Sequence, residues 1–193
     1  MTGAAEEHIR VVPFSDAVEQ LATTEGWETA YPHLDQAGEQ ALDALVAGLA
    51  HRNSRVRQWC AALLDHHADE RCVPGLLRLL EDPVAAVRRH ALHSIGCQPC
   101  KPSPLAIDAV PLLLDLATRD PSVRVRRAAA HLLGCQPPDA RAAAGLRLVA
   151  GQDPDDKVRR NAHWALVQHG GDYVRVPACP LPGAGVEVLA AQG

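Results

Sequence analysis

One short motif occurs four times in the chain, as Val56-Arg57-Gln58, Val87-Arg88-Arg89, Val125-Arg126-Arg127 and Val158-Arg159-Arg160. The four valines are separated by 31, 38 and 33 residues. Self-similarity at a period of this length is typical of stacked helical repeats, in which each unit covers the apolar face of its neighbour. We call this sequence the Val-Arg motif, and it predicts a repeat array.

A second helix is predicted ahead of each Val-Arg motif. Ala41, Leu42, Leu45, Val46 and Leu49 recur at the spacing of one apolar helix face. Similar apolar sets precede the other three motifs, at residues 73–80, 107–117 and 140–150. Each repeat is therefore expected to be a pair of helices, with the Val-Arg motif in the second one.

Asp-Pro dipeptides stand between the paired helices in three repeats, at Asp82-Pro83, Asp120-Pro121 and Asp153-Pro154. Asp is favoured at a helix N-cap and Pro at the first helical position, so these dipeptides are expected to begin the second helices. Gly96 and Gly134 follow two of these helices, where a left-handed residue often ends a helix.

The order of helix, Asp-Pro loop, Val-Arg helix and Gly resembles the HEAT-like repeat family, including the short bacterial form named after phycobilisome lyases. The resemblance covers residues 38–170 and implies an all-α fold. It also implies a ladder of hydrogen bonds between repeats, formed by the loop Asp and the first Arg of each motif. The matching pairs are Asp82 with Arg88, Asp120 with Arg126, and Asp153 with Arg159. His51 stands where Asp belongs before Arg57, which leaves the first rung open.

The expected architecture is an α-solenoid of about four HEAT-like helical hairpins with an N-terminal helical cap. In the cap, residues 16–24 form one short helix and a second short helix ends near His33. The Pro- and Gly-containing tail is expected to be partly disordered. The predicted boundaries are 1–37 for the cap, 38–69, 70–101, 102–137 and 138–170 for the repeats, and 171–193 for the tail.

The 193-residue chain has a formal net charge of −4, and the charge is unevenly distributed. Residues 1–50 contain one basic and nine acidic side chains, whereas residues 51–193 contain 18 basic and 14 acidic ones. This pattern makes nucleic acid an unexpected partner but permits a local anion-binding face. The sequence shows no secretory signal and no apolar segment of the roughly 20 residues that span a membrane, so a cytoplasmic protein without membrane contact is expected.

The third residue of each motif is Arg in three motifs and Gln58 in the first. If the Val faces the core, this residue and the one four positions later are expected to point away from it, toward the concave surface. Arg guanidinium groups suit carboxylates, and Trp is common in binding hot spots. These positions therefore predict a partner-binding stripe, although solvated Arg with incidental His remains an alternative interpretation. The predicted stripe consists of Arg89, His93, Arg127, His131, Arg160 and Trp164.

Cys97 and Cys135 lie in two near-copies, Gly-Cys-Gln-Pro, and Cys100 completes a C-x-x-C motif with the first. His93 and His131 each precede a cysteine by four residues. We expect ordinary thiols at helix ends and predict no cofactor, while a metal site or a redox pair among these residues stays open. The nearby sequence from Asp65 to Asp69 is expected to be a solvated helix end.

A non-catalytic protein-interaction or scaffold module that binds an acidic partner is the leading functional hypothesis. The sequence contains no zinc-protease, phosphate-loop, α/β-hydrolase or kinase signature. The resemblance also includes DNA glycosylases, which would need an acidic residue and aromatic side chains near the centre of a basic groove. A chromophore lyase or biosynthetic helper rests on the family resemblance alone.

Overall fold

The computed structural model describes residues 13–101 and 103–170. Within these residues the chain is helical, and two short 3₁₀ turns, η1 (Gly38–Ala41) and η2 (Glu70–Cys72), lead into helices. The α-helices are α1 (Phe14–Gln20), α2 (Thr24–Ala37), α3 (Leu42–Gly48), α4 (Ser54–His67), α5 (Val73–Leu79), α6 (Ala85–Gly96), α7 (Ala109–Arg119), α8 (Val123–Gly134), α9 (Ala140–Gln152) and α10 (Asp156–Gly170).

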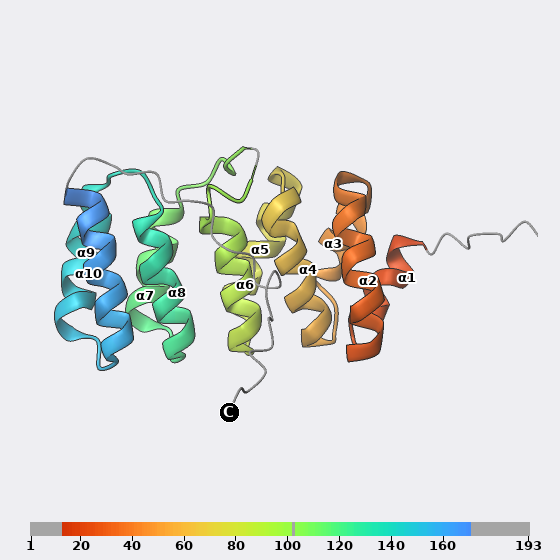
Figure 1. The fold of residues 1–193 in the computed structure, drawn as a ribbon, viewed down its shortest axis with the longest axis horizontal. Helices are drawn as coiled ribbons and strands as arrows, with labels where there is room; N and C mark the ends of the chain where they lie inside the picture. Colours follow the sequence, from red (N-terminus) through yellow and green to blue (C-terminus); the bar gives the residue numbers. More distant parts are fainter. Residues whose placement is uncertain (1–12, 102, 171–193) are drawn as a thin grey trace, which may run out of the picture.

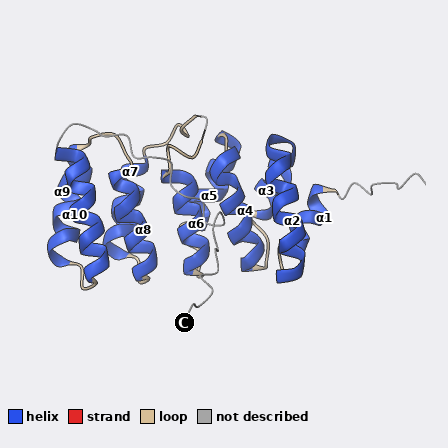
Figure 2. Ribbon diagram, in the orientation of Figure 1, coloured by secondary structure: helices blue, strands red, loops and turns tan. Residues whose placement is uncertain are grey.

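The helices form two layers along one axis (Figure 1). Helices α4, α6, α8 and α10 pack on one another in sequence and form the layer that contains the Val-Arg motifs. Helices α3, α5, α7 and α9 each pack on the following helix and form the second layer. Figure 2 shows the same row of helices, with the loops at the ends of the individual helices, along the two edges of the row. The expected all-α solenoid is confirmed.

The apolar positions of the motif form the core between the layers. The four motif valines are 0% exposed, and so are the residues four positions later, which are Cys60, Ala91, Ala129 and Ala162. Burying one valine contributes about 2 kcal/mol, and a small residue one turn later lets a neighbouring helix approach. Burial also raises the pKa of the Cys60 thiol to about 12, so Cys60 is a packing group and not a reactive thiolate.

The N-terminal helices extend both layers by one position. Helix α1 packs on α3, and α2 packs on α4. Helix α2 continues to Ala37, beyond the end expected near His33, and Gly38 follows it with a φ of 54°. This left-handed conformation favours glycine and turns the chain into η1. The tail predicted for residues 171–193 lies outside the described residues.

A ladder of Arg–Asp contacts connects successive repeats. Arg88 Nε lies 2.7 Å from Asp120 Oδ2, and Arg126 Nε lies 2.7 Å from Asp153 Oδ2, so each guanidinium reaches the loop carboxylate of the next repeat. The same Arg turns its Nη1 to the backbone carbonyl of its own loop Asp, at 2.8 Å for Arg88 and 3.0 Å for Arg126. Arg159 makes the backbone contact, with Asp153, at 2.8 Å.

The first rung of the ladder is also present, although His51 replaces Asp. Arg57 Nε lies 2.6 Å from Asp82 Oδ2, and its Nη1 donates to the His51 carbonyl at 2.8 Å. The backbone carbonyl is available whatever the side chain. His51 Nδ1 accepts from the Asn53 backbone N–H at 3.0 Å, and its Nε2 lies 3.3 Å from Glu19 on α1. The imidazole therefore takes the turn-forming role of the carboxylate and adds a contact to the N-terminal helix.

The Asp-Pro dipeptides do not begin the second helices, contrary to the sequence expectation. Helices α6 and α8 begin at Ala85 and Val123, three residues after the Asp. The Asp120 carboxylate accepts the N–H two residues later, at 2.8 Å, while its remaining capacity is used by Arg88. These carboxylates form Asx turns within the loop, and in this position the Arg of the preceding repeat reaches them.

Gly96 and Gly134 also differ from their predicted role, because neither has a positive φ. Both are the last residues of their helices and lie against the next helix of the same layer. A Cβ built on Gly134 would lie 2.6 Å from Trp164 Cζ3 and 2.9 Å from Ala165 Cα. These glycines allow close helix packing, which the sequence pattern alone does not distinguish from a left-handed cap.

Candidate functional site

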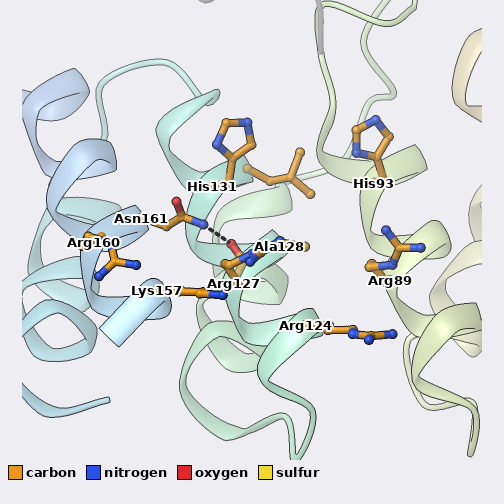
Figure 3. Close-up of a pocket in the computed structure, with 10 residues that line it drawn as sticks. Arg89, His93, Arg124, Arg127, Ala128, His131, Lys157, Arg160 and Asn161 are labelled. Atoms are coloured by element: carbon orange, nitrogen blue, oxygen red, sulfur yellow. Dashed lines mark hydrogen bonds between the residues drawn. The ribbon is translucent and has the colours of Figure 1, made fainter. Parts of the chain in front are cut away.

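A groove runs across three successive helices of the motif layer, α6, α8 and α10 (Figure 3). Its cavity volume is about 920 Å³. The lining residues are Arg89, His93, Arg124, Arg127, Ala128, His131, Leu132, Lys157, Arg160 and Asn161. We call this site the basic groove.

Five of the six residues predicted for the partner-binding stripe line the basic groove, and Trp164 is the exception. Its indole ring stacks on the His131 imidazole, with centroids 4.8 Å apart and an interplanar angle of 15°. The same ring lies against Gly134 at the end of α8. Trp164 therefore supports the His131 side chain from behind, because its ring is used in packing between α8 and α10.

Five lining residues were not predicted from the sequence, and three of them are polar: Arg124, Lys157 and Asn161. Arg124 and Lys157 each stand three residues before the second Arg of their motif, one helical turn earlier on the same face. Both residues could therefore have been predicted by extending the helical period by one turn. Asn161 bridges neighbouring helices, since its Nδ2 donates to the Arg127 backbone carbonyl at 3.3 Å.

Positive charge dominates the groove lining as far as the described residues form it: five Arg or Lys side chains and no carboxylate. Burial lowers the pKa of Arg89, and the charges of Arg124 and Arg127 lower it further. Arg160 is the lining cation with a nearby acidic partner, Asp156, one turn before it on α10. The groove thus concentrates like charges that an anionic ligand would relieve.

His131 adds little to this charge. Burial and the charge of His93 lower the pKa of His131, which favours the neutral imidazole at physiological pH. Burial, Arg89 and His93 also lower the pKa of buried His90 to about 3. The permanent positive charges of the groove lining are those of its Arg and Lys side chains.

An aromatic cluster continues the same face toward the N-terminal end and was not predicted. Trp59 on α4 occupies the motif position of Ala128 and Asn161, three residues after the valine. Its ring centroid lies 5.2 Å from that of Trp27, 5.8 Å from that of Tyr31 and 5.8 Å from that of His90. Burial, then Asp35 and Asp65, raise the pKa of Tyr31 to about 12.

A separate polar cluster lies where α4 and α6 end. Cys97 and Cys100 form a disulfide, and His93 Nε2 lies 3.8 Å from Cys100 Sγ. Asp65 faces the same point and is 0% exposed, so the expected solvated helix end is wrong for this residue. Burial lowers the pKa of the adjacent Lys101 amine, against the opposite effect of Asp65.

The near-copy around Cys135 has a different role. Gln136 Nε2 donates to the Gly96 carbonyl at 2.7 Å and to the Leu132 carbonyl at 3.0 Å, and Gln136 Oε1 accepts from Gln98 at 3.0 Å. The repeated glutamines therefore connect the ends of α6 and α8. His131 and Cys135 do not join the cluster around Asp65.

Comparison with known proteins gives one family and a set of similar folds. HEAT repeats match the sequence over residues 42–109 and 110–176. No curated protein matches the chain. None of the helices in the described part of the chain combines the length and the apolar character needed to cross a membrane.

Two solved structures similar to the chain are engineered proteins. A designed armadillo repeat protein in complex with the peptide (KR)4 is 17% identical, with 80% of each chain covered and a TM-score of 0.50. A second engineered protein is 19% identical, with 80% of this chain and 79% of that chain covered and a TM-score of 0.48. At these identities the likeness concerns the fold alone.

Proposed function

The chain belongs to the HEAT repeat family, and on this premise we propose that it is a non-catalytic interaction module that holds an acidic segment of a protein partner in the basic groove. HEAT and armadillo folds are typical of protein-interaction scaffolds, because stacked repeats present a long continuous surface. The family supports an interaction module, and the charge of the groove supports an acidic partner.

The observation that carries this proposal is a lining that, among the described residues, contains five cations and no carboxylate, contributed by three successive helices. Arg guanidinium groups bind carboxylates through paired N–H donors, and such charge-assisted hydrogen bonds are stronger than neutral ones. The cations stand on α6, α8 and α10, so a ligand that contacts all of them must extend across the repeats. A run of Asp or Glu side chains on an extended segment meets this requirement.

The similar designed armadillo repeat protein was solved with the basic peptide (KR)4. The groove of this chain is itself basic, so charge complementarity requires the opposite sign of ligand.

An acidic protein segment fits the lining better than a nucleic acid. Proteins that bind single strands stack bases on exposed aromatic rings, and the groove lining among the described residues contains no Phe, Tyr or Trp. The glycosylase alternative would also need a carboxylate near the groove centre, and no lining residue supplies one within the described chain. Neither observation favours a nucleic-acid enzyme.

Fluorescence anisotropy with labelled peptides tests the proposal. An octaglutamate peptide is expected to bind the full chain, and its affinity should fall as salt rises, because exposed charges are screened. An octalysine peptide of the same length is the matched control and should not bind. A single-stranded DNA oligonucleotide that binds more tightly than octaglutamate at equal salt would contradict the assignment to an acidic protein segment.

A further inference from the structure

Four side chains with metal-ligating atoms meet where α4 and α6 end, outside the cation set of the basic groove. They are Asp65 of α4, His93 of α6, and Cys97 and Cys100 of the following loop. Their ligand atoms all lie within 4.8 Å of one another. Asp65 comes from the first repeat and the other three from the second, so the cluster joins two repeats.

The buried Asp65 carboxylate indicates that this cluster can bind a cation. It is 0% exposed, and neither of its oxygens has a hydrogen-bond partner. His93 Nε2 lies 3.1 Å from Oδ2 and Lys101 Nζ lies 3.5 Å from Oδ1. Buried carboxylates in folded proteins are normally hydrogen-bonded or bound to a metal, because an unsatisfied one is costly. A cation between Asp65 and its neighbours would satisfy it.

We propose that Asp65, His93, Cys97 and Cys100 bind one Zn²⁺ when the two cysteines are thiols. Two thiolates, one imidazole and one carboxylate are ligands that Zn²⁺ accepts in tetrahedral structural sites. The edges of such a tetrahedron measure roughly 3.3–3.8 Å for bonds of about 2.0–2.3 Å. The distances from His93 Nε2 to Asp65 Oδ2, 3.1 Å, and to Cys100 Sγ, 3.8 Å, are close to these edges.

Lys101 lies beside the proposed ligands. Two thiolates and one carboxylate around Zn²⁺ leave a net charge of −1 in a buried place. The Lys101 side chain is 1% exposed, and its Nζ donates to the Cys97 carbonyl at 3.0 Å while lying 3.5 Å from Asp65. The amine therefore lies beside the ligand set, where a positive charge would offset that of the metal site.

The disulfide and the metal site exclude each other. Binding requires a dithiol reductant, which delivers two electrons and two protons to the Cys97–Cys100 bond and becomes a disulfide itself. The two thiols formed then lose their protons to water as they bind Zn²⁺. A disulfide-exchange enzyme would instead place its reactive cysteine at a helix N-terminus, whereas Cys97 follows the C-terminus of α6.

Metal titration of the full chain tests this site with Zn²⁺ and Co²⁺ as the probes. After reduction under argon, the chain should bind one metal ion, and Co²⁺ should give the absorption bands of a tetrahedral thiolate site. The oxidised chain should bind none. A reduced chain without thiolate–cobalt absorption, or an oxidised chain that binds equally well, overturns the proposal, and this comparison needs no variant.

Two histidine variants then identify the ligands. His93→Asn should weaken Zn²⁺ binding at least about tenfold, because a ligand is lost. His131→Asn, the matched change in the next repeat, should bind as wild type, since His131 lies outside the cluster. Asp65→Asn should behave like His93→Asn. Wild-type affinity in both His93→Asn and Asp65→Asn, with helicity checked by circular dichroism, contradicts the ligand assignment.

Discussion

Arg88 and Asp120, 32 residues apart in sequence, form a buried pair of hydrogen bonds, from Nε to Oδ2 at 2.7 Å and from Nη2 to Oδ1 at 2.8 Å. The adjacent Arg89 lines the basic groove instead. The two arginines of one Val-Arg motif therefore have different partners: the first connects repeats and the second faces the groove.

Breaking this pair should be costly. The side chains of Arg88 and Asp120 are 10% and 2% exposed, so Arg88→Gln leaves a buried carboxylate without its cation. We expect a loss of about 3 kcal/mol in the free energy of unfolding, measured by urea denaturation. Arg119→Gln is the control, because Arg119 pairs with Asp115 at the surface and should change stability by no more than about 0.5 kcal/mol. Equal losses of stability in both variants would show that the buried Arg88–Asp120 pair contributes no more than a surface ion pair.

The Asp153 rung predicts acid sensitivity. Burial alone would raise the pKa of Asp153, but the hydrogen bonds from Arg126 and from the Asp155 backbone lower it below its ordinary value of 3.8. Its stabilisation is therefore present above pH 3.8 and is lost as pH falls through the lower folded pKa. Asp153→Asn should be less stable than wild type by a constant amount from about pH 7 to pH 5, and the difference should shrink below about pH 4. Calorimetric melting temperatures across this range test it, and a difference that grows in acid contradicts it.

His51 tests whether a turn can use imidazole in place of carboxylate. His51→Asp keeps an acceptor for the Asn53 N–H and should lie close to wild type in melting temperature. His51→Ala removes the acceptor, and we expect a loss of about 1 kcal/mol. If the two variants melt at the same temperature, the side chain of His51 contributes nothing to the stability of this turn.

Gly134 and Gly151 form a matched pair for testing close packing. A Cβ at Gly134 meets Trp164 and the Ala165 backbone, whereas one at Gly151 meets nothing within 4 Å. Gly134→Ala should destabilise the fold by about 1–3 kcal/mol, because the helices must move apart. Gly151→Ala should be neutral or stabilise by up to about 1 kcal/mol, because α9 gains helix propensity. Thermal unfolding of both variants tests this prediction. A Gly134→Ala protein as stable as wild type would mean that α8 and α10 can move apart without loss of stability.

The helical repeats could be predicted from the sequence because the motif valines and the small residues after them report one buried face. The contacts of the loop Asp residues and of the glycines at the helix ends could not be predicted. The Asp120 carboxylate accepts hydrogen bonds from Arg88 of the preceding repeat and from the Ser122 backbone N–H of its own loop. Only the stacked structure shows that one carboxylate accepts both. Gly96 and Gly134 likewise depend on the neighbouring helix.

The groove was partly predictable for the same reason. Arg89, Arg127 and Arg160 follow from the period, and Arg124 and Lys157 follow from extending it by one turn. Asp65 could not be predicted, because its burial depends on the long connection between α6 and α7. Residues of that connection, including Cys97, Cys100 and Lys101, fold back over the end of α4. Local polarity suggested a solvated end at this place.

Binding of octaglutamate by charge-reversed variants tests whether the basic groove binds acidic segments. Arg127→Glu with Arg160→Glu removes two exposed cations of the basic groove, whereas Arg78→Glu with Arg147→Glu makes the same charge change on the exposed surfaces of α5 and α9. We predict at least about tenfold weaker binding in the groove variant, nearly wild-type binding in the control, and similar melting temperatures. Equal affinities in the two variants would contradict a specific basic groove.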